Sequence, residues 1–108
     1  MIPSLGRVVA YTLSAQDAER VNRRRSDAAH ARAAYKRSGY VVHIGNDALA
    51  GEVYPLVITR VWEAGYGQPV TEDTLVNGQV LLDGNDTLWV TSVRQGEGDG
   101  TWREFPRV

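Results

Sequence analysis

The feature that most constrains this chain is a run over residues 15–37 that contains neither glycine nor proline. The run is rich in alanine and arginine, which are both strong helix formers. Ser14 stands at the position of a helix N-cap, and Asp17 follows three residues later, close to the capping-box spacing. Gly39 comes just after the run, where helices commonly end. The sequence therefore predicts one continuous helix over residues 15–37.

The rest of the chain has the pattern of short β-strands separated by turns. The apolar and β-branched stretches predict strands over residues 6–13, 40–44, 53–62, 75–82, 88–93 and 101–105. The first of these is apolar on both faces, so we expect it in a central position. The Asp-Gly-Asn-Asp sequence at 83–86 is a hairpin turn signal, which predicts an antiparallel meander over 53–93.

These elements predict a mainly β protein. Several short strands and tight hairpins in so short a chain are typical of a small barrel. The order of the strands resembles that of an SH3-like or Tudor-like antiparallel barrel, with the long Arg-rich α-helix inserted after the first strand. The length of 108 residues suits a single domain over residues 1–108.

Composition excludes some classes of site and of location. The chain has no cysteine, so it forms no disulfide and no thiolate metal site. Its two histidines, His30 and His43, have no partner at a metal-binding spacing, so we expect no metal. No apolar run approaches the roughly 20 residues of a membrane helix, and residues 1–6 do not resemble a signal peptide. We therefore expect a cytoplasmic protein.

Charge is divided unevenly along the chain. Residues 1–37 hold eight basic and three acidic side chains, a formal charge of +5, and residues 38–108 hold four basic and ten acidic ones, which gives −6. The positive charge is concentrated on the predicted helix. This division favours an anionic ligand at one place over a broad nucleic-acid surface. It also suits contacts between subunits.

The helix carries an arginine cluster whose members differ in their neighbours. Arg23 is spaced for ion pairs with Glu19 and Asp27, one turn to either side. Arg24 has the like-charged Arg20 one turn earlier, and Arg25 has no acidic residue three or four positions away. Two alternatives remain for these last two arginines: they pair with acidic residues of the strand region, or they present their planar donors to an anion such as phosphate.

Small and aromatic residues lead to two further expectations. The alanines of the helix form a thin apolar stripe, which packs either on the protein's own barrel or against a second helix in a homo-oligomer; we expect the homo-oligomer. Trp89 lies mid-strand and is expected in the core, whereas Trp62 and Trp102 lie at strand ends, where they would line a groove.

No catalytic motif is present in the sequence. There is no cysteine nucleophile and no Gly-x-Ser-x-Gly elbow, and no pair of carboxylates stands at a spacing typical of hydrolases. The glycine-rich stretch 96–100 resembles a phosphate-binding loop but lacks its lysine, and its two acids would repel phosphate. We therefore expect a binding protein that is not an enzyme and uses no cofactor.

Several segments also carry a family resemblance. They are residues 1–11 (MIPSLGRVVAY), 17–25 (DAERVNRRR), 53–62 (beginning VYP and ending RVW), 76–91 (VNGQVLLDGNDTLWVT) and the tail 96–106. With them, most of the chain resembles a family of small proteins encoded by bacteriophages, particularly phages of actinobacteria. The tail departs from the family pattern at Phe105, where the second aromatic of Trp-x-Trp-Pro is expected. The resemblance implies a location in the host cytoplasm and transfers no residue roles.

The phage context and the arginine cluster lead to a first functional hypothesis: a non-catalytic sponge, an anti-defence protein that sequesters an anionic nucleotide second messenger of bacterial immune signalling. In it, arginines would bind phosphates, an asparagine would bind base or ribose, and an aromatic ring would stack on the base. The predicted ligand-binding residues are Arg20, Asn22, Arg24, Arg25, Tyr11 and Trp102. The alternative is an interaction module that binds and inhibits a host protein through the helix or a barrel face. The net charge of −1 disfavours nucleic acid as the partner.

Overall fold

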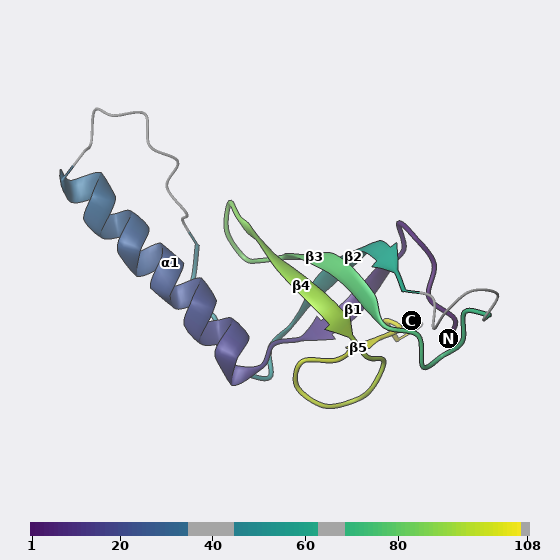
Figure 1. Cartoon of the computed structure of the whole chain (residues 1–108). Helices are drawn as coiled ribbons and strands as arrows, with labels where there is room; N and C mark the ends of the chain where they lie inside the picture. Colours follow the sequence, from purple (N-terminus) through teal and green to yellow (C-terminus); the bar gives the residue numbers. More distant parts are fainter. Residues whose placement is uncertain (35–44, 63–68, 107–108) are drawn as a thin grey trace.

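The computed structural model describes residues 1–34, 45–62 and 69–106, with the side chains of residues 28–34 excepted (Figure 1). The elements in chain order are β1 (Val8–Thr12), α1 (Ala15–Ala34), β2 (Val53–Val61), β3 (Val76–Leu81), β4 (Thr87–Val93) and β5 (Trp102–Arg103). The mainly β class and the helix after the first strand are therefore confirmed. The strand predicted over 40–44 and the last three residues of the predicted helix, 35–37, lie outside the described residues.

The strands form one antiparallel sheet in the order β4-β3-β2-β1-β5. β1 lies between β2 and β5, which confirms its predicted central position. β2, β3 and β4 are consecutive neighbours, so the predicted meander is also confirmed. Figure 1 shows α1 starting beside the end of β1 and running past the turn between β3 and β4, away from the sheet.

The predicted closure of the sheet into a barrel is wrong. β5 has only two residues, and both pair with β1, opposite Ala10 and Tyr11. The chain after β4 meets β5 at a single bridge between Gln95 and Trp102, where the Trp102 amide donates to the carbonyl of Arg94 at 3.1 Å. Closure requires a continuous ladder between the last strands, and a two-residue β5 is too short to provide one. Among the described residues, β4 therefore keeps an open edge.

The inner face of the sheet holds the hydrophobic core. The strand register places Val9, Leu56, Val80 and Leu88 in one row across β1, β2, β3 and β4, and all four are fully buried. Helix α1 contributes Val21 to the same core. Burying each of these side chains stabilises the fold by about 1.5–3 kcal/mol. Among the described residues, no helix is long and apolar enough to span a membrane.

The outer face of the sheet carries a second row that is partly open to solvent. Val8, Val57, Gln79 and Trp89 follow one another across the same four strands. Trp89 is 57% exposed, so its predicted place in the core is wrong. Successive side chains of a strand point to opposite faces, and β4 directs Leu88 inward, which leaves Trp89 on the outside.

The start of α1 is fixed by the predicted capping box. The Ser14 amide donates to Asp17 Oδ2 at 3.0 Å, and the Asp17 amide donates to Ser14 Oγ at 3.1 Å. Asp17 also accepts a hydrogen bond of 2.5 Å from the Tyr11 hydroxyl on β1. The cap therefore satisfies free amides of the first turn and ties the helix to the neighbouring strand.

Candidate functional site

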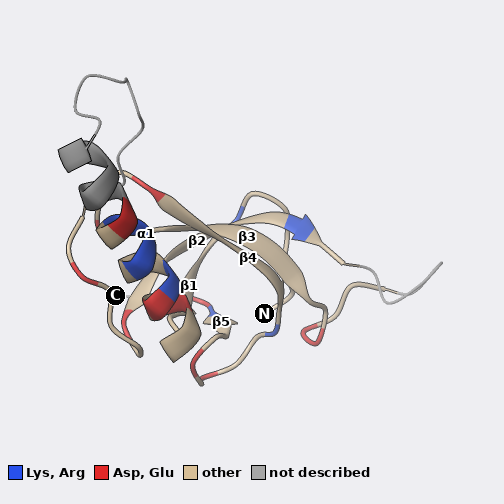
Figure 2. Ribbon diagram, turned by 60° about the vertical axis from the view of Figure 1, so that its left-hand side comes forward, with Lys and Arg blue, Asp and Glu red and all other residues tan. Residues whose placement is uncertain are grey.

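Two of the predicted ligand-binding arginines pair with one buried carboxylate of the strand region. Arg24 Nη2 lies 3.2 Å from Asp86 Oδ2, and Arg25 Nη2 lies 3.1 Å from Asp86 Oδ1. The Asp86 side chain is only 3% exposed, against 8% for Arg25 and 35% for Arg24. Figure 2 shows basic residues grouped on α1 and acidic residues in several turns and loops. Of the two alternatives that the sequence left open, the structure contains the internal pairing.

Backbone contacts complete this attachment of α1. Arg25 also donates to the carbonyls of Asn46 and Asp83. Asn22 donates through Nδ2 to the Ala48 carbonyl and accepts from the Ala48 amide, both at 2.8 Å. We call Asn22, Arg24 and Arg25, with their partners in 46–48 and 83–87, the helix clamp. It holds α1 against two segments that are distant in sequence, so these three side chains already have structural partners.

Trp102 and Arg23 are the next two residues whose roles were predicted from the sequence. Trp102 is fully buried in the core, so its ring offers no surface for a ligand to stack on in this structure. Arg23 forms the expected exposed ion pair with Glu19. The structure thus separates the predicted ligand-binding set: Arg20 and Tyr11 line a common pocket, and the other four do not contribute to its lining.

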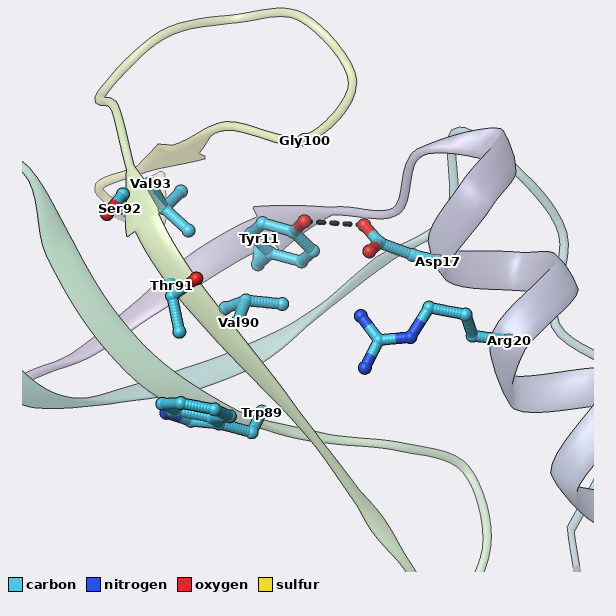
Figure 3. Close-up of a pocket in the computed structure, with 9 residues that line it drawn as sticks. All are labelled: Tyr11, Asp17, Arg20, Trp89, Val90, Thr91, Ser92, Val93 and Gly100. Atoms are coloured by element: carbon cyan, nitrogen blue, oxygen red, sulfur yellow. Dashed lines mark hydrogen bonds between the residues drawn. The ribbon is translucent and has the colours of Figure 1, made fainter.

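That pocket has a volume of about 400 Å³ and lies between the first turns of α1 and the open edge of β4 (Figure 3). Small-molecule sites range over roughly 300–1,000 Å³, so its size is near the lower end of that range. The lining residues are Tyr11, Asp17, Arg20, Trp89, Val90, Thr91, Ser92, Val93 and Gly100.

Arg20 is the cation of the pocket. Its exposed side chain extends from α1 toward β4 in Figure 3. Within the part of the chain that the structure describes, it forms no ion pair, unlike Arg23, Arg24 and Arg25 one turn later. An exposed guanidinium in this state has all of its donors available for an anion.

Tyr11 and Asp17 form the wall beside Arg20. Burial raises the pKa of the Tyr11 hydroxyl above its ordinary value, and the Asp17 carboxylate raises it further, while Arg20 acts in the opposite direction. Tyr11 therefore stays protonated and continues to donate to Asp17. Asp17 is engaged by this bond and by the cap of α1 and forms no ion pair with Arg20, although its negative charge lies beside Arg20 in the lining of the pocket.

Comparison of the chain with family models, curated proteins and solved structures found no match. The chemistry of the pocket therefore rests on its own residues.

Sequence reasoning missed the contribution of β4 to this pocket. Trp89, Thr91 and Ser92 line it from the strand that was expected to lie within a closed barrel. Ser92 has a φ of +53°, a left-handed conformation that is uncommon for a residue other than glycine. The polar Thr87 and Thr91, which stand two positions before and after Trp89 and so share its face of the strand, were the available signal for an outward tryptophan. No local pattern indicated that the edge of β4 would be open.

Proposed function

We propose that this protein is a non-catalytic binding protein that holds a nucleotide-like anionic small molecule in the pocket between α1 and β4. The observation that carries the proposal is the exposed Arg20 guanidinium, which has no ion-pair partner among the described residues and lines a pocket that Trp89 also lines. On the basis of the phage resemblance, we propose that the protein sequesters a nucleotide second messenger of bacterial immune signalling in the host cytoplasm.

The pocket provides the two kinds of contact that a nucleotide requires. A guanidinium binds phosphate through charge-assisted, bidentate hydrogen bonds worth about 1.5–3 kcal/mol each. The indole of Trp89, which is 57% exposed and lies on the outer side of β4, offers a π-face for a base that extends around the edge of β4, and base–aromatic stacking contributes roughly 1–3 kcal/mol. The protein needs no catalytic group for this role, because sequestration requires only affinity.

A thermal-shift and calorimetric titration with AMP, GMP, ADP-ribose and cyclic di-GMP tests the proposal. A nucleotide at 100 times its Kd should raise the free energy of unfolding by about 2.7 kcal/mol. Arg20→Ala should weaken binding of that nucleotide at least about tenfold, since it removes a charge-assisted contact. Arg23→Ala is the matched control, because it removes the same charge from the next turn, outside the pocket. Equal affinities of the two variants would contradict the proposal.

The outer face of the sheet favours a second candidate function, self-association into a homo-oligomer. In the outer row, Val8, Val57 and Gln79 carry no charge, and Leu81 extends this row along β3 with another exposed apolar side chain. A two-fold contact brings the same patch of each copy together. An uncharged row meets its own copy without opposing like charges, so a second copy of this chain is the occupant that we propose.

Light scattering at micromolar concentration tests this second candidate. We expect a mass of at least twice the 11.9 kDa chain, and we expect Leu81→Glu to return it to the mass of one chain. Leu81 does not line the pocket, so nucleotide binding should persist in that variant. A wild-type mass of one chain would exclude self-association and leave the pocket proposal standing.

A further inference from the structure

We infer that the open edge of β4 recognises the nucleobase of the bound nucleotide through backbone hydrogen bonds from Trp89 and Thr91. This inference rests on the proposed function and specifies its ligand: a nucleotide that presents a base edge with adjacent donor and acceptor groups, as distinct from a sugar phosphate. Arg20 then serves the phosphate, and β4 serves the base.

The direction of the β4 backbone groups follows from two hydrogen bonds of the structure. Arg24 on α1 donates to the Thr87 carbonyl at 3.1 Å, so the groups of Thr87 point away from β3 and toward the helix side. In an antiparallel strand the outward direction recurs at every second residue. The backbone N–H and C=O of Trp89 and Thr91 therefore point outward as well.

The other end of β4, at Ser92, independently gives the same alternation of inward and outward backbone groups. The Ser92 amide donates to Asn77 Oδ1 on β3 at 2.8 Å, which directs it inward. A peptide unit points its C=O opposite to its N–H, so the Thr91 carbonyl in the same unit points outward.

These outward groups reach the pocket because, within the described ranges of the chain, β4 has a neighbouring strand on one side only. At Thr87 the edge is covered by Arg24, but residues 89–93 line the pocket consecutively, as expected when a strand presents its edge. Figure 3 shows this stretch of β4 facing Tyr11 and Arg20. The left-handed conformation of Ser92 ends the regular edge just after Thr91.

The chemistry of this edge is that of a base-pairing surface. One strand residue offers an N–H donor beside a C=O acceptor, and a purine or pyrimidine edge offers an acceptor beside a donor. Backbone groups of a rigid strand are fixed before the ligand arrives, so pairing costs little ordering of the protein. A phosphorylated sugar without a base has no such edge and gains only the Arg20 contact.

A proline replacement removes one backbone donor without touching the β3 ladder. Thr91→Pro eliminates the outward N–H, and proline is tolerated on edge strands where the N–H faces away from the sheet. Thr91→Val is the matched control, because it removes the hydroxyl and keeps the N–H. Calorimetry with AMP and GMP should show binding at least about tenfold weaker for Thr91→Pro than for Thr91→Val. Ribose 5-phosphate should bind the wild-type protein at least about tenfold more weakly than the nucleotides.

The outcomes separate this inference from the proposed function. A cooperatively folded Thr91→Pro variant, checked by circular dichroism, that binds as tightly as Thr91→Val would overturn the β4 inference and leave the Arg20 site intact. Ribose 5-phosphate binding as tightly as AMP to the wild-type protein would do the same without any variant. Binding of no nucleotide in the panel by the wild-type protein would overturn the proposed function, and this inference with it.

Discussion

Replacement of Arg25 by alanine tests whether the arginine cluster holds α1 in place. The change removes the buried ion pair with Asp86 and the donors to the carbonyls of Asn46 and Asp83. If the cluster served only a ligand, the variant would keep its stability, since alanine is the best helix former. The structure predicts the opposite: a large loss of stability.

The magnitude follows from burial. Breaking a buried ion pair by removing one partner costs about 3–5 kcal/mol, because the other charge stays buried without compensation. Here Arg24 still contacts Asp86, and Asn46 and Asp83 lie at the surface, where water replaces the lost donors. We therefore expect the lower end of the range, about 3 kcal/mol. That is a large part of the roughly 5–15 kcal/mol available to a natural domain.

Urea denaturation followed by tryptophan fluorescence measures the effect. Arg24→Ala should cost about 1 kcal/mol, because the Arg24 side chain is partly exposed and Arg25 continues to pair with Asp86. Arg23→Ala breaks only a surface pair with Glu19 and should cost under about 0.5 kcal/mol. We predict that the loss of stability decreases in the order Arg25→Ala, Arg24→Ala, Arg23→Ala. Equal losses for Arg25→Ala and Arg23→Ala would refute the reasoning about burial.

Three further predictions concern other parts of the fold. Because the pKa of Tyr11 is raised above its ordinary value of 10.0, the stabilising contribution of Tyr11 is complete below pH 10 and is lost as the pH rises above that value. The Tyr11→Phe variant lacks the bond to Asp17, so its free energy of unfolding should fall less steeply than that of the wild-type protein as the pH is raised in an alkaline titration. Gly78→Ala should cost about 1–3 kcal/mol in urea denaturation, since a Cβ there would lie 2.6 Å from Leu56 Cδ2; an unchanged midpoint would contradict this packing. Ser92→Gly should keep or raise the melting temperature by relieving the positive φ, whereas Ser92→Val should lower it, because a β-branched residue tolerates that conformation poorly.

The local elements of this protein are determined by the sequence. The run without glycine or proline, together with Ser14 and Asp17, specifies where α1 begins, because capping and helix propensity act between residues a few positions apart. The Asp-Gly turn at 83–86 specifies the β3–β4 hairpin for the same reason. The alternation of β4 also separates Leu88 from Trp89, although the faces were assigned wrongly from the apolar character of the whole strand.

The tertiary structure alone decided which of these elements meet. Asp86 is 61 residues from Arg25 in the chain, and no sequence pattern at that distance distinguishes an arginine that pairs internally from one that awaits an anion. The burial of Trp102 was not assignable from the sequence, because burial depends on which parts of the sheet are covered. The open edge of β4 arises because β5 ends after two residues, both paired with β1, and that edge, with Arg20 facing it, creates the candidate site. Such long-range pairings follow from the packing of the whole chain and leave no local signal in the sequence.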